Sequence, residues 1–388
     1  MHVSEPIKDA LGVAWCTGSG YVARRDALDE IGNFPLGSLA EDVATSTLLL
    51  GRGWKTAYIH ESLQFGTVPD TYGGHIKQRT RWVSHLNVNF YCAHLTRQQA
   101  IGTVDTSFKL KFCLWGDNIR HLTFMQRLSS FVYALLSLFN IFLTLSLFAM
   151  PVVLISNKAM VAYANDTELR WLIRSCFAAF VSNRLCEIVL YLPSGYATGQ
   201  RGSRAQLWMA PYVAITIIRS FLLPKWLGGR AQAFRPTGPL KSSLNERDPT
   251  RRAPVSRRLR VILFNYLAWF HISYVYFCIA AVILSSYRCI LDTKLSTRLI
   301  CLLTHAGWPP MTWIIVISAF WIPINYACDP PNMPDRETLL QRDPKTGVAH
   351  PTPKSKKIAF RPETALFEVE YTITTVFTAV VFGAAFFY

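Results

Sequence analysis

The chain has 388 residues, of which 51% are hydrophobic and only 16% are charged. Soluble proteins average about 25% charged residues, so this composition argues against a disordered chain and against a wholly soluble one. The net charge of +16 would suit a nucleic-acid binder, but the basic residues lie between long apolar runs, which favours the cytosolic face of a membrane. The sequence therefore predicts a membrane protein with a soluble front part.

The first part of the chain, up to about Leu128, carries the turn and cap signals of a globular α/β fold. Asp26 is placed to cap a short helix that Gly32 ends, and the alternation of strand and helix signals is typical of an α/β sheet. The predicted elements are, in chain order, strand 21–23, helix 27–31, helix 43–50, strand 54–59 and helix 74–89. These are only fragments of a sheet, so the soluble part is predicted to be half a domain.

Six apolar segments follow the soluble part. They cover residues 131–155, 172–192, 207–223, 261–286, 299–328 and 371–388. Four of them carry no charge, whereas 172–192 contains two arginines and a glutamate and 207–223 is short. Ten lysines and arginines crowd the loop 225–260, which should therefore lie in the cytosol.

Counting the crossings from a cytosolic soluble part gives five spans. Segment 207–223 then lies along the membrane interface, because a further span would put the basic loop outside the cytosol. The same count puts the sole Asn-x-Thr sequon, at Asn165, outside, where N-glycosylation can occur. The predicted parts are a soluble domain over 1–128, a transmembrane region over 129–326, a cytosolic tail segment over 327–365 and a last transmembrane helix over 366–388.

Glu41 and Asp42 are the first candidates for chemistry, because they directly precede a predicted helix. Carboxylates at a helix N-terminus are stabilised by the helix dipole, so capping alone explains them. The functional alternative makes Asp42 a general base that takes a proton from an acceptor hydroxyl. The two residues by themselves leave both interpretations open.

Gln78, Arg81 and Trp82 form the second candidate group. On a helix they lie at positions i, i+3 and i+4, and therefore on one face. A guanidinium suits a diphosphate, and an indole suits stacking on a sugar ring or a base. An ordinary amphipathic helix with a tryptophan anchor explains the same three residues.

The order and spacing of the motifs around these candidates resembles the processive family 2 glycosyltransferases, which are cellulose, chitin and hyaluronan synthase-like membrane enzymes. The resemblance is closest to the fungal cellulose-synthase-like type, and it applies to the C-terminal part of such an enzyme. The motifs are Cys16 to Arg25, Leu39-Ala40-Glu41-Asp42-Val43, Gly53-Trp54-Lys55, Glu61-Ser62-Leu63, Val68-Pro69-Asp70 and Gln78 to Trp82. Ala40 departs from the pattern, because the family has Thr at that position.

The resemblance implies a partial α/β domain of the GT-A glycosyltransferase type, followed by an all-α transmembrane bundle. It makes Asp42, beside Glu41, the catalytic base, and it assigns Gln78, Arg81 and Trp82 to the diphosphate and the acceptor. The implied reaction transfers a sugar from a UDP-sugar to a growing glycan with inversion, as in cell-wall polysaccharide biosynthesis. The implied partners are the membrane lipid and a synthase complex, at the plasma membrane or the Golgi, with no nucleic acid.

A third match lies in the basic loop. Phe234-Arg235-Pro236-Thr237-Gly238 resembles the gating loop that covers the nucleotide in cellulose synthases, although Pro239 occupies its lysine position. This resemblance makes Phe234 and Thr237 gating residues. A Pro/Gly turn in a basic loop explains the same residues equally well.

The donor-binding half that the family carries is expected to be missing, because the metal-binding Asp-x-Asp occurs nowhere in this sequence. The intact enzyme should use Mg²⁺ or Mn²⁺, for which this chain offers no motif. Two other classes of protein stay open. A non-catalytic fragment would associate with a full-length synthase, and a multi-span transporter would not need Asp42.

The remaining signals are assigned to structure. The nine cysteines include no Cys-x-x-Cys pair, and Cys289 and Cys301 are expected to be two ordinary buried thiols although they could pair. The arginines of 251–260 are expected to orient the chain and contact anionic lipid. Arg184 and Glu187, three residues apart, can form an ion pair.

Overall fold

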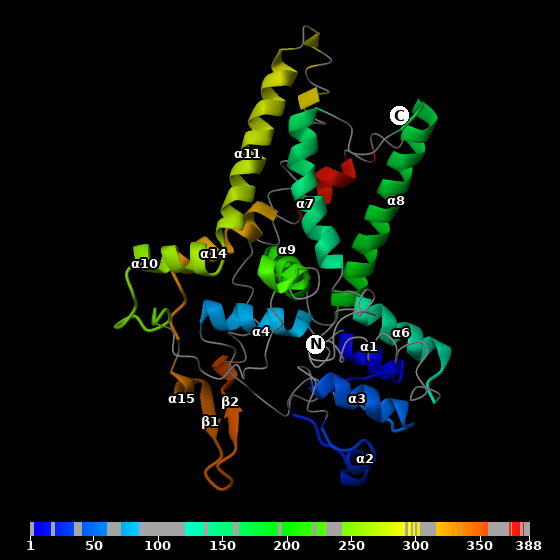
Figure 1. The fold of residues 1–388 in the computed structure, drawn as a ribbon, viewed down its shortest axis with the longest axis vertical. Coiled ribbons are helices and arrows are strands. Elements are labelled where there is room, and N and C mark those ends of the chain that lie inside the picture. The colour runs from blue at the N-terminus through cyan, green and yellow to red at the C-terminus, as the bar shows by residue number, and fades with distance from the viewer. Residues whose placement is uncertain are drawn as a thin grey trace. The chain divides into compact units, whose positions relative to one another are not determined.

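The computed structural model describes the chain in stretches. The described residues are 4–16, 20–34, 41–59, 71–84, 121–135, 139–157, 163–192, 196–219, 223–229, 243–291, 316–333 and 335–355, with single or few residues between 294 and 302 and between 372 and 383. The chain divides into two compact units (Figure 1). Unit 1 comprises Met1–Phe142, Pro211–Arg247 and Gln341–Pro351, and unit 2 comprises Leu143–Ala210, Asp248–Leu340 and Thr352–Tyr388.

Unit 1 is built from short helices. They are α1 (Ser4–Ala10), α2 (Arg25–Glu30), α3 (Glu41–Gly51), α4 (Tyr72–Ser84) and α6 (Phe124–Leu135). The sequence predicts the existence of α2, α3 and α4, and these predictions are confirmed. α3 begins two residues before its predicted start, so Glu41 and Asp42 are its first two residues.

The predicted strands at 21–23 and 54–59 do not form, and the described backbone there is neither helical nor paired in a ladder. Within the described ranges, the only strands are β1 (Leu340–Arg342) and β2 (Ala349–Pro351), which pair as a hairpin. A strand pattern reports a backbone preference, but a ladder also needs a partner strand. Segment 54–59 is held instead by side chains, since Thr56 Oγ1 donates to the Ala14 carbonyl at 2.8 Å.

Helices α2 and α3 end in the same hydrogen-bond motif. Gly32 N donates to Asp29 O and Asn33 N to Leu28 O, which is a Schellman motif with glycine in the left-handed conformation (φ +77°). Gly53 (φ +89°) ends α3 in the same way. The predicted stop at Gly32 is therefore confirmed. The predicted cap is wrong, because Asp26 is the second residue of α2 and the N-cap residue is Arg24.

Unit 2 contains three long helices within the described residues: α7 (Phe139–Ser156), which begins in unit 1, α8 (Asp166–Tyr191) and α11 (Trp269–Ile290). Shorter helices accompany them: α10 (Val255–Arg260), a π-helix (Val261–Asn265), α14 (Ile322–Cys328) and α15 (Arg336–Leu339). α9 (Tyr196–Ile217) crosses the unit boundary at Pro211. A 3-10 turn (Lys225–Leu227) belongs to unit 1.

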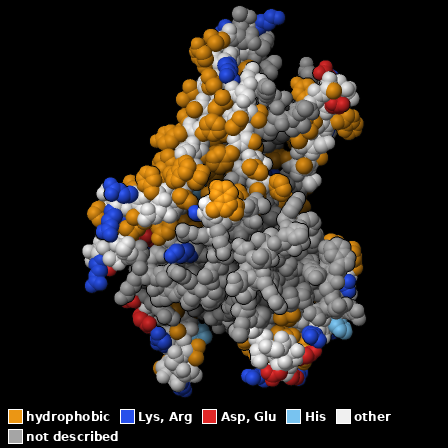
Figure 2. All heavy atoms as spheres, in the orientation of Figure 1, with side chains coloured by type: hydrophobic (Ala, Val, Ile, Leu, Met, Phe, Trp, Pro, Cys, Tyr) orange, Lys and Arg blue, Asp and Glu red, His pale blue; other side chains and the backbone are white. Residues whose placement is uncertain are grey.

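Two described helices, α7 and α11, are long and apolar enough to cross a membrane. α11 exposes an apolar stripe at helical spacing: Tyr276, Ile279, Ile283, Tyr287 and Ile290. Figure 2 shows hydrophobic side chains over this part of unit 2 and Lys and Arg side chains near α10. An exposed apolar stripe on a long helix suits contact with lipid.

The predicted bounds of both spans shift in the structure. The apolar run 131–155 takes in the end of α6, up to Leu135, and α7 from Phe139, with residues 136–138 outside the described ranges. The run 261–286 begins with the π-helix and turns at Leu267, whose φ is +59°, before α11 starts at Trp269. Hydropathy alone does not register the turn at Leu267, because this residue is itself apolar.

The core of unit 2 surrounds the first turns of α11. His271 and Tyr274 both pack edgewise or tilted against Phe320, each at 4.8 Å between ring centroids. His271 Nε2 lies 2.7 Å from the Trp208 carbonyl oxygen of α9. These buried aromatic contacts fix α11 against residues 316–320 and the unit 2 part of α9.

Two structural assignments made from the sequence are wrong. Cys289 and Cys301 form a disulfide, with their Cα atoms 5.5 Å apart. Sequence spacing could not show this, because it depends on the chain folding back at the end of α11. Arg258 is 4% exposed and donates to the carbonyls of Ala253, Ala327 and Cys328, so it holds the end of α14 and does not contact lipid.

We predict opposite effects for the same substitution at two glycines. Gly53→Ala should destabilise the protein by about 1–2 kcal/mol, because an L-residue is strained in the left-handed conformation. Gly202→Ala, inside α9 with open space around its Cα, should stabilise it by about 0.5–1 kcal/mol. Thermal unfolding of both variants in detergent tests this, and equal shifts would contradict it.

Candidate active site

The first turn of α3 packs against the segment that contains Cys16. The backbone N–H of Cys16 donates to Ser46 Oγ at 2.7 Å, and Ser46 Oγ donates in turn to the Asp42 carbonyl at 2.9 Å. Ser46 and its neighbour Thr45 are fully buried, whereas Asp42 is half-buried. Two motifs that the sequence analysis singled out, around Cys16 and around Asp42, are therefore adjacent in unit 1.

The Cys16 thiol reports on this environment. Burial raises the pKa of Cys16 above its ordinary value, the hydrogen bond with Ser46 lowers it, and the negative charge of Asp42 raises it further. The Asp42 backbone is tied to this segment through Ser46, and its side chain is half-buried, which suits a base that is partly shielded from water and still reachable.

α4 carries the second group of candidates. Gln78 is half-buried, and Arg81 and Trp82 follow it on the same helix. The spacing of i, i+3 and i+4 puts the three residues on one face, as the sequence predicts. The structure describes the backbone of Arg81 and Trp82, and their side chains lie outside the described atoms.

The start of α4 is held from two directions. Thr71 Oγ1 accepts from the Gly74 N–H at 3.0 Å, which is an N-cap bond. Glu246, 1% exposed, accepts from the Tyr72 N–H at 2.9 Å, although it lies 174 residues further along the chain. The hydroxyls of Tyr72 and Tyr212 lie 3.0 Å apart, and burial raises the pKa of Tyr212.

Sequence reasoning missed Glu246. Its signal is an acidic residue inside a loop of ten basic residues, together with the neighbouring Leu244, which is also fully buried. A carboxylate in such surroundings is more easily explained by a specific partner than by solvation. The partner itself could not be read from the sequence, because it is a backbone amide in a distant helix.

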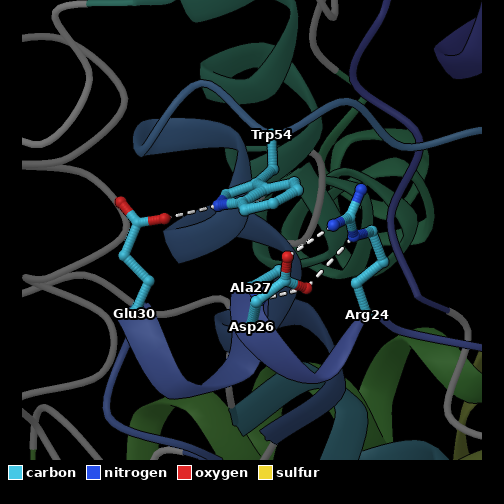
Figure 3. A network of polar contacts seen from close by, with 5 residues as sticks. All are labelled: Arg24, Asp26, Ala27, Glu30 and Trp54. Atoms are coloured by element: carbon cyan, nitrogen blue, oxygen red, sulfur yellow. Dashed lines mark hydrogen bonds and ion pairs between the residues drawn. The ribbon is translucent and has the colours of Figure 1, made fainter.

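Trp54 belongs to another of the motifs, and Figure 3 shows its surroundings. Its indole Nε1 donates to Glu30 Oε2 at 2.7 Å, and the Arg24 guanidinium lies 5.4 Å from its ring centroid. Arg24 also pairs with Asp26 and lowers the pKa of that carboxyl. These contacts give Trp54 a structural role, because they tie the segment after α3 to α2.

The other candidates fall in three places. Phe234 and Thr237 of the gating-like motif lie outside the described residues, as do the motifs at 61–63 and 68–70. Asn165 is exposed and caps α8, because its Oδ1 accepts from the Glu168 N–H at 2.8 Å. Arg184 and Glu187 form the predicted ion pair at 2.6 Å.

A metal site is not formed by the described residues. Within those ranges, no group of three or more His, Cys, Asp or Glu side chains is placed to hold a metal ion. Mg²⁺ and Mn²⁺ prefer several carboxylate or water oxygens in octahedral geometry. Asp42 and Glu41 alone do not supply such a set.

Residues 3–181 match the family described as Glycosyl transferase family group 2. The matched range contains Glu41, Asp42 and all of α4, and it continues through α7 into α8. The chemistry of the site and this match together support a glycosyltransferase of family 2. The GT-A fold of that family is the fold they suggest for the soluble part.

Shorter stretches are similar to bacterial cellulose synthases. The cellulose synthase catalytic subunit [UDP-forming] of Komagataeibacter sucrofermentans is 37% identical over 65 residues, which is 17% of this chain and 9% of that protein. The corresponding subunit of Xanthomonas axonopodis pv. citri is 34% identical over 74 residues, 19% of this chain and 10% of that protein. Cellulose synthase 1 of Komagataeibacter xylinus is 28% identical over 151 residues, 38% of this chain and 9% of that protein.

The chain thus spans about a tenth of the length of these relatives. The similarity supports a function like that of a polysaccharide synthase. The fungal subtype and the C-terminal placement stay predictions.

The Cys16–Asp42 proximity gives a prediction that does not depend on activity. Asp42→Asn removes the charge that raises the pKa of Cys16, so the thiolate fraction and the rate of Cys16 alkylation should increase. Asp26→Asn, an exposed control in the same unit, should leave that rate unchanged. Iodoacetamide labelling at several pH values, read at Cys16 by mass spectrometry, measures it. An unchanged rate of Cys16 alkylation in Asp42→Asn would show that the Asp42 carboxylate does not act on the Cys16 thiol.

Proposed function

We propose that this chain is part of a membrane-bound, inverting β-glycosyltransferase that transfers a sugar from a UDP-sugar to a growing glycan. The observation that carries the proposal is the packing of the first turn of α3, with Asp42, against the Cys16 segment. This arrangement lies inside the range that matches the family 2 glycosyltransferases. Inversion, the UDP-sugar donor and the identity of the glycan are parts of the proposal.

Each candidate residue takes one role in a single displacement. Asp42 takes the proton from the acceptor hydroxyl as that oxygen attacks the anomeric carbon, and the diphosphate leaves from the opposite face. Glu41 shares the first turn of α3 with Asp42.

α4 would serve the leaving group and the acceptor. Arg81 and Gln78 stabilise the charge that develops on the diphosphate, and Trp82 supports the acceptor sugar by stacking. Phe234 and Thr237 would cover the nucleotide as a gating segment. The divalent metal expected for the intact enzyme would require ligands beyond the described residues, and no step is assigned to it here.

We also propose that the protein is a multi-pass protein of the plasma membrane or the Golgi. α7 and α11 supply two candidate spans, and the exposed apolar stripe of α11 supports lipid contact. The part of the family match beyond residue 128 covers α7 and the first half of α8. Sugar transfer beside such spans fits a synthase that elongates its product at a membrane.

The central test is Asp42→Asn in membranes that contain the full protein. Sugar incorporation from a UDP-sugar should fall by about 10²–10⁴-fold, because the variant lacks the base. Asp26→Asn, a carboxylate tied to Arg24 on the surface, is the matched control and should retain activity. Protein levels are compared by immunoblot, so that loss of protein is not taken for loss of catalysis.

Two outcomes would replace the proposal. Full activity in Asp42→Asn would remove this residue as the base and would suit a transporter. Background incorporation with the wild-type chain, together with co-purification of a larger synthase, would make the chain a non-catalytic subunit. Incorporation that depends on Asp42 separates the enzyme from both.

Asn165 gives a second prediction about the same membrane arrangement. If the start of α8 faces the secretory lumen, PNGase F should increase the gel mobility of the protein, and Asn165→Gln should abolish the shift. Thr167→Ser keeps a sequon and should keep the shift. Arg247→Thr in the Asn165→Gln background creates a sequon at Asn245 in the basic loop, where no glycan is expected. A glycan at that position would invert the orientation.

A further inference from the structure

The disulfide and the buried Arg258 mark opposite ends of α11. Cys289 lies one residue before the end of the helix and is bonded to Cys301. Arg258 lies before its start and holds the carbonyls of Ala327 and Cys328. α11 rises by about 30 Å between its first residue and Cys289, which equals the hydrocarbon thickness of a bilayer.

Two residues that follow α11 contact its opposite ends. Cys301 is fixed at the disulfide end, whereas Phe320 packs against His271 and Tyr274 in the first turns of the helix. Arg252 adds to the contacts near the start of α11, because it donates to Asn332 Oδ1 at 2.6 Å and to the Pro330 carbonyl at 3.1 Å.

α7 runs in the same direction as α11 (Figure 1). Phe148 packs edgewise on Tyr274 at 5.0 Å, and Arg288 donates to the carbonyl of Ile155 near the end of α7. Phe148 precedes Ile155 in α7, and their partners Tyr274 and Arg288 follow in the same order in α11, so the two helices run in the same direction. The ends of α7 and α11 consequently lie on the same face of the membrane.

Charge identifies which face this is. Ten lysines and arginines lie in 225–260, at the start of α11, whereas the loop around the disulfide has three: Arg288, Lys294 and Arg298. The excess marks the start of α11 as cytosolic. Disulfides persist in the secretory pathway and outside the cell and are rare in the cytosol, so the bond independently favours the same orientation.

We propose that Cys289–Cys301 is a disulfide on the non-cytosolic face of the membrane, where it ties Cys301 to the end of α11. The inference rests on the membrane part of the proposed function and not on sugar transfer. In forming the bond, the two thiols lose two protons and two electrons. A protein disulfide of the secretory pathway accepts them and is released as a dithiol.

The test is sided cysteine labelling of the full protein in intact cells, read residue by residue by mass spectrometry. A membrane-impermeant maleimide should label Cys289 and Cys301 only after an impermeant phosphine has reduced them. Cys328, an exposed free cysteine at the arginine end, is the matched control and should react only after the membrane is permeabilised.

The variant Cys289→Ser sharpens the test. It leaves the Cys301 thiol free, so Cys301 should react in intact cells without reductant, whereas Cys328→Ser should leave Cys301 unreactive until reduction. Labelling of the pair without reductant in permeabilised cells would show two thiols and overturn the proposal. Labelling of the reduced pair only after permeabilisation would overturn its orientation. Sugar incorporation that depends on Asp42, measured in the same membranes, tests the glycosyltransferase proposal separately. Failure of the disulfide proposal or of its orientation would therefore not be mistaken for failure of the glycosyltransferase proposal.

Discussion

The helix that carries Gln78, Arg81 and Trp82 begins with a hydrogen bond to a buried carboxylate. Glu246 is 1% exposed and accepts from the first backbone N–H of α4. A negative charge at a helix N-terminus is favoured by the dipole, and the buried amide would cost about 1–3 kcal/mol without an acceptor. The orientation of α4 therefore depends on the basic loop, although that loop lies far away in the sequence.

This bond also bears on the gating-like motif. Phe234 and Thr237 precede Glu246 by about ten residues in the same loop, and Glu246 contacts the first turn of α4. The loop that carries this motif is therefore tied to α4 at Glu246. In the proposed enzyme, the segment that covers the nucleotide and the helix that binds the diphosphate would respond to the same contact.

The features that the sequence predicted are those with local causes. Gly32 ends α2 because glycine adopts the left-handed conformation, and Arg184 and Glu187 pair because they lie one turn apart. The predictions failed where a distant partner decides the outcome. The strand at 54–59 lacks a ladder in the described residues, Cys301 pairs by a fold-back of the chain, and Arg258 is buried against α14. For the candidate site, the sequence predicts helices α3 and α4. It does not predict the contacts that hold them, which are those of Ser46 with Cys16 and of Glu246 with Tyr72.

α8 shows how geometry can decide what hydropathy leaves open. Because α7 and α11 are parallel, two such spans require one return crossing between them, and α8, with 26 residues, is about 39 Å long. Its charges would be costly in lipid if they were isolated. Arg184 is paired with Glu187 at 2.6 Å, and the Arg174 guanidinium lies 5.5 Å from the Trp171 ring centroid. The pairing lowers the cost of burying these side chains, so the charged helix is compatible with the return span that the parallel pair requires.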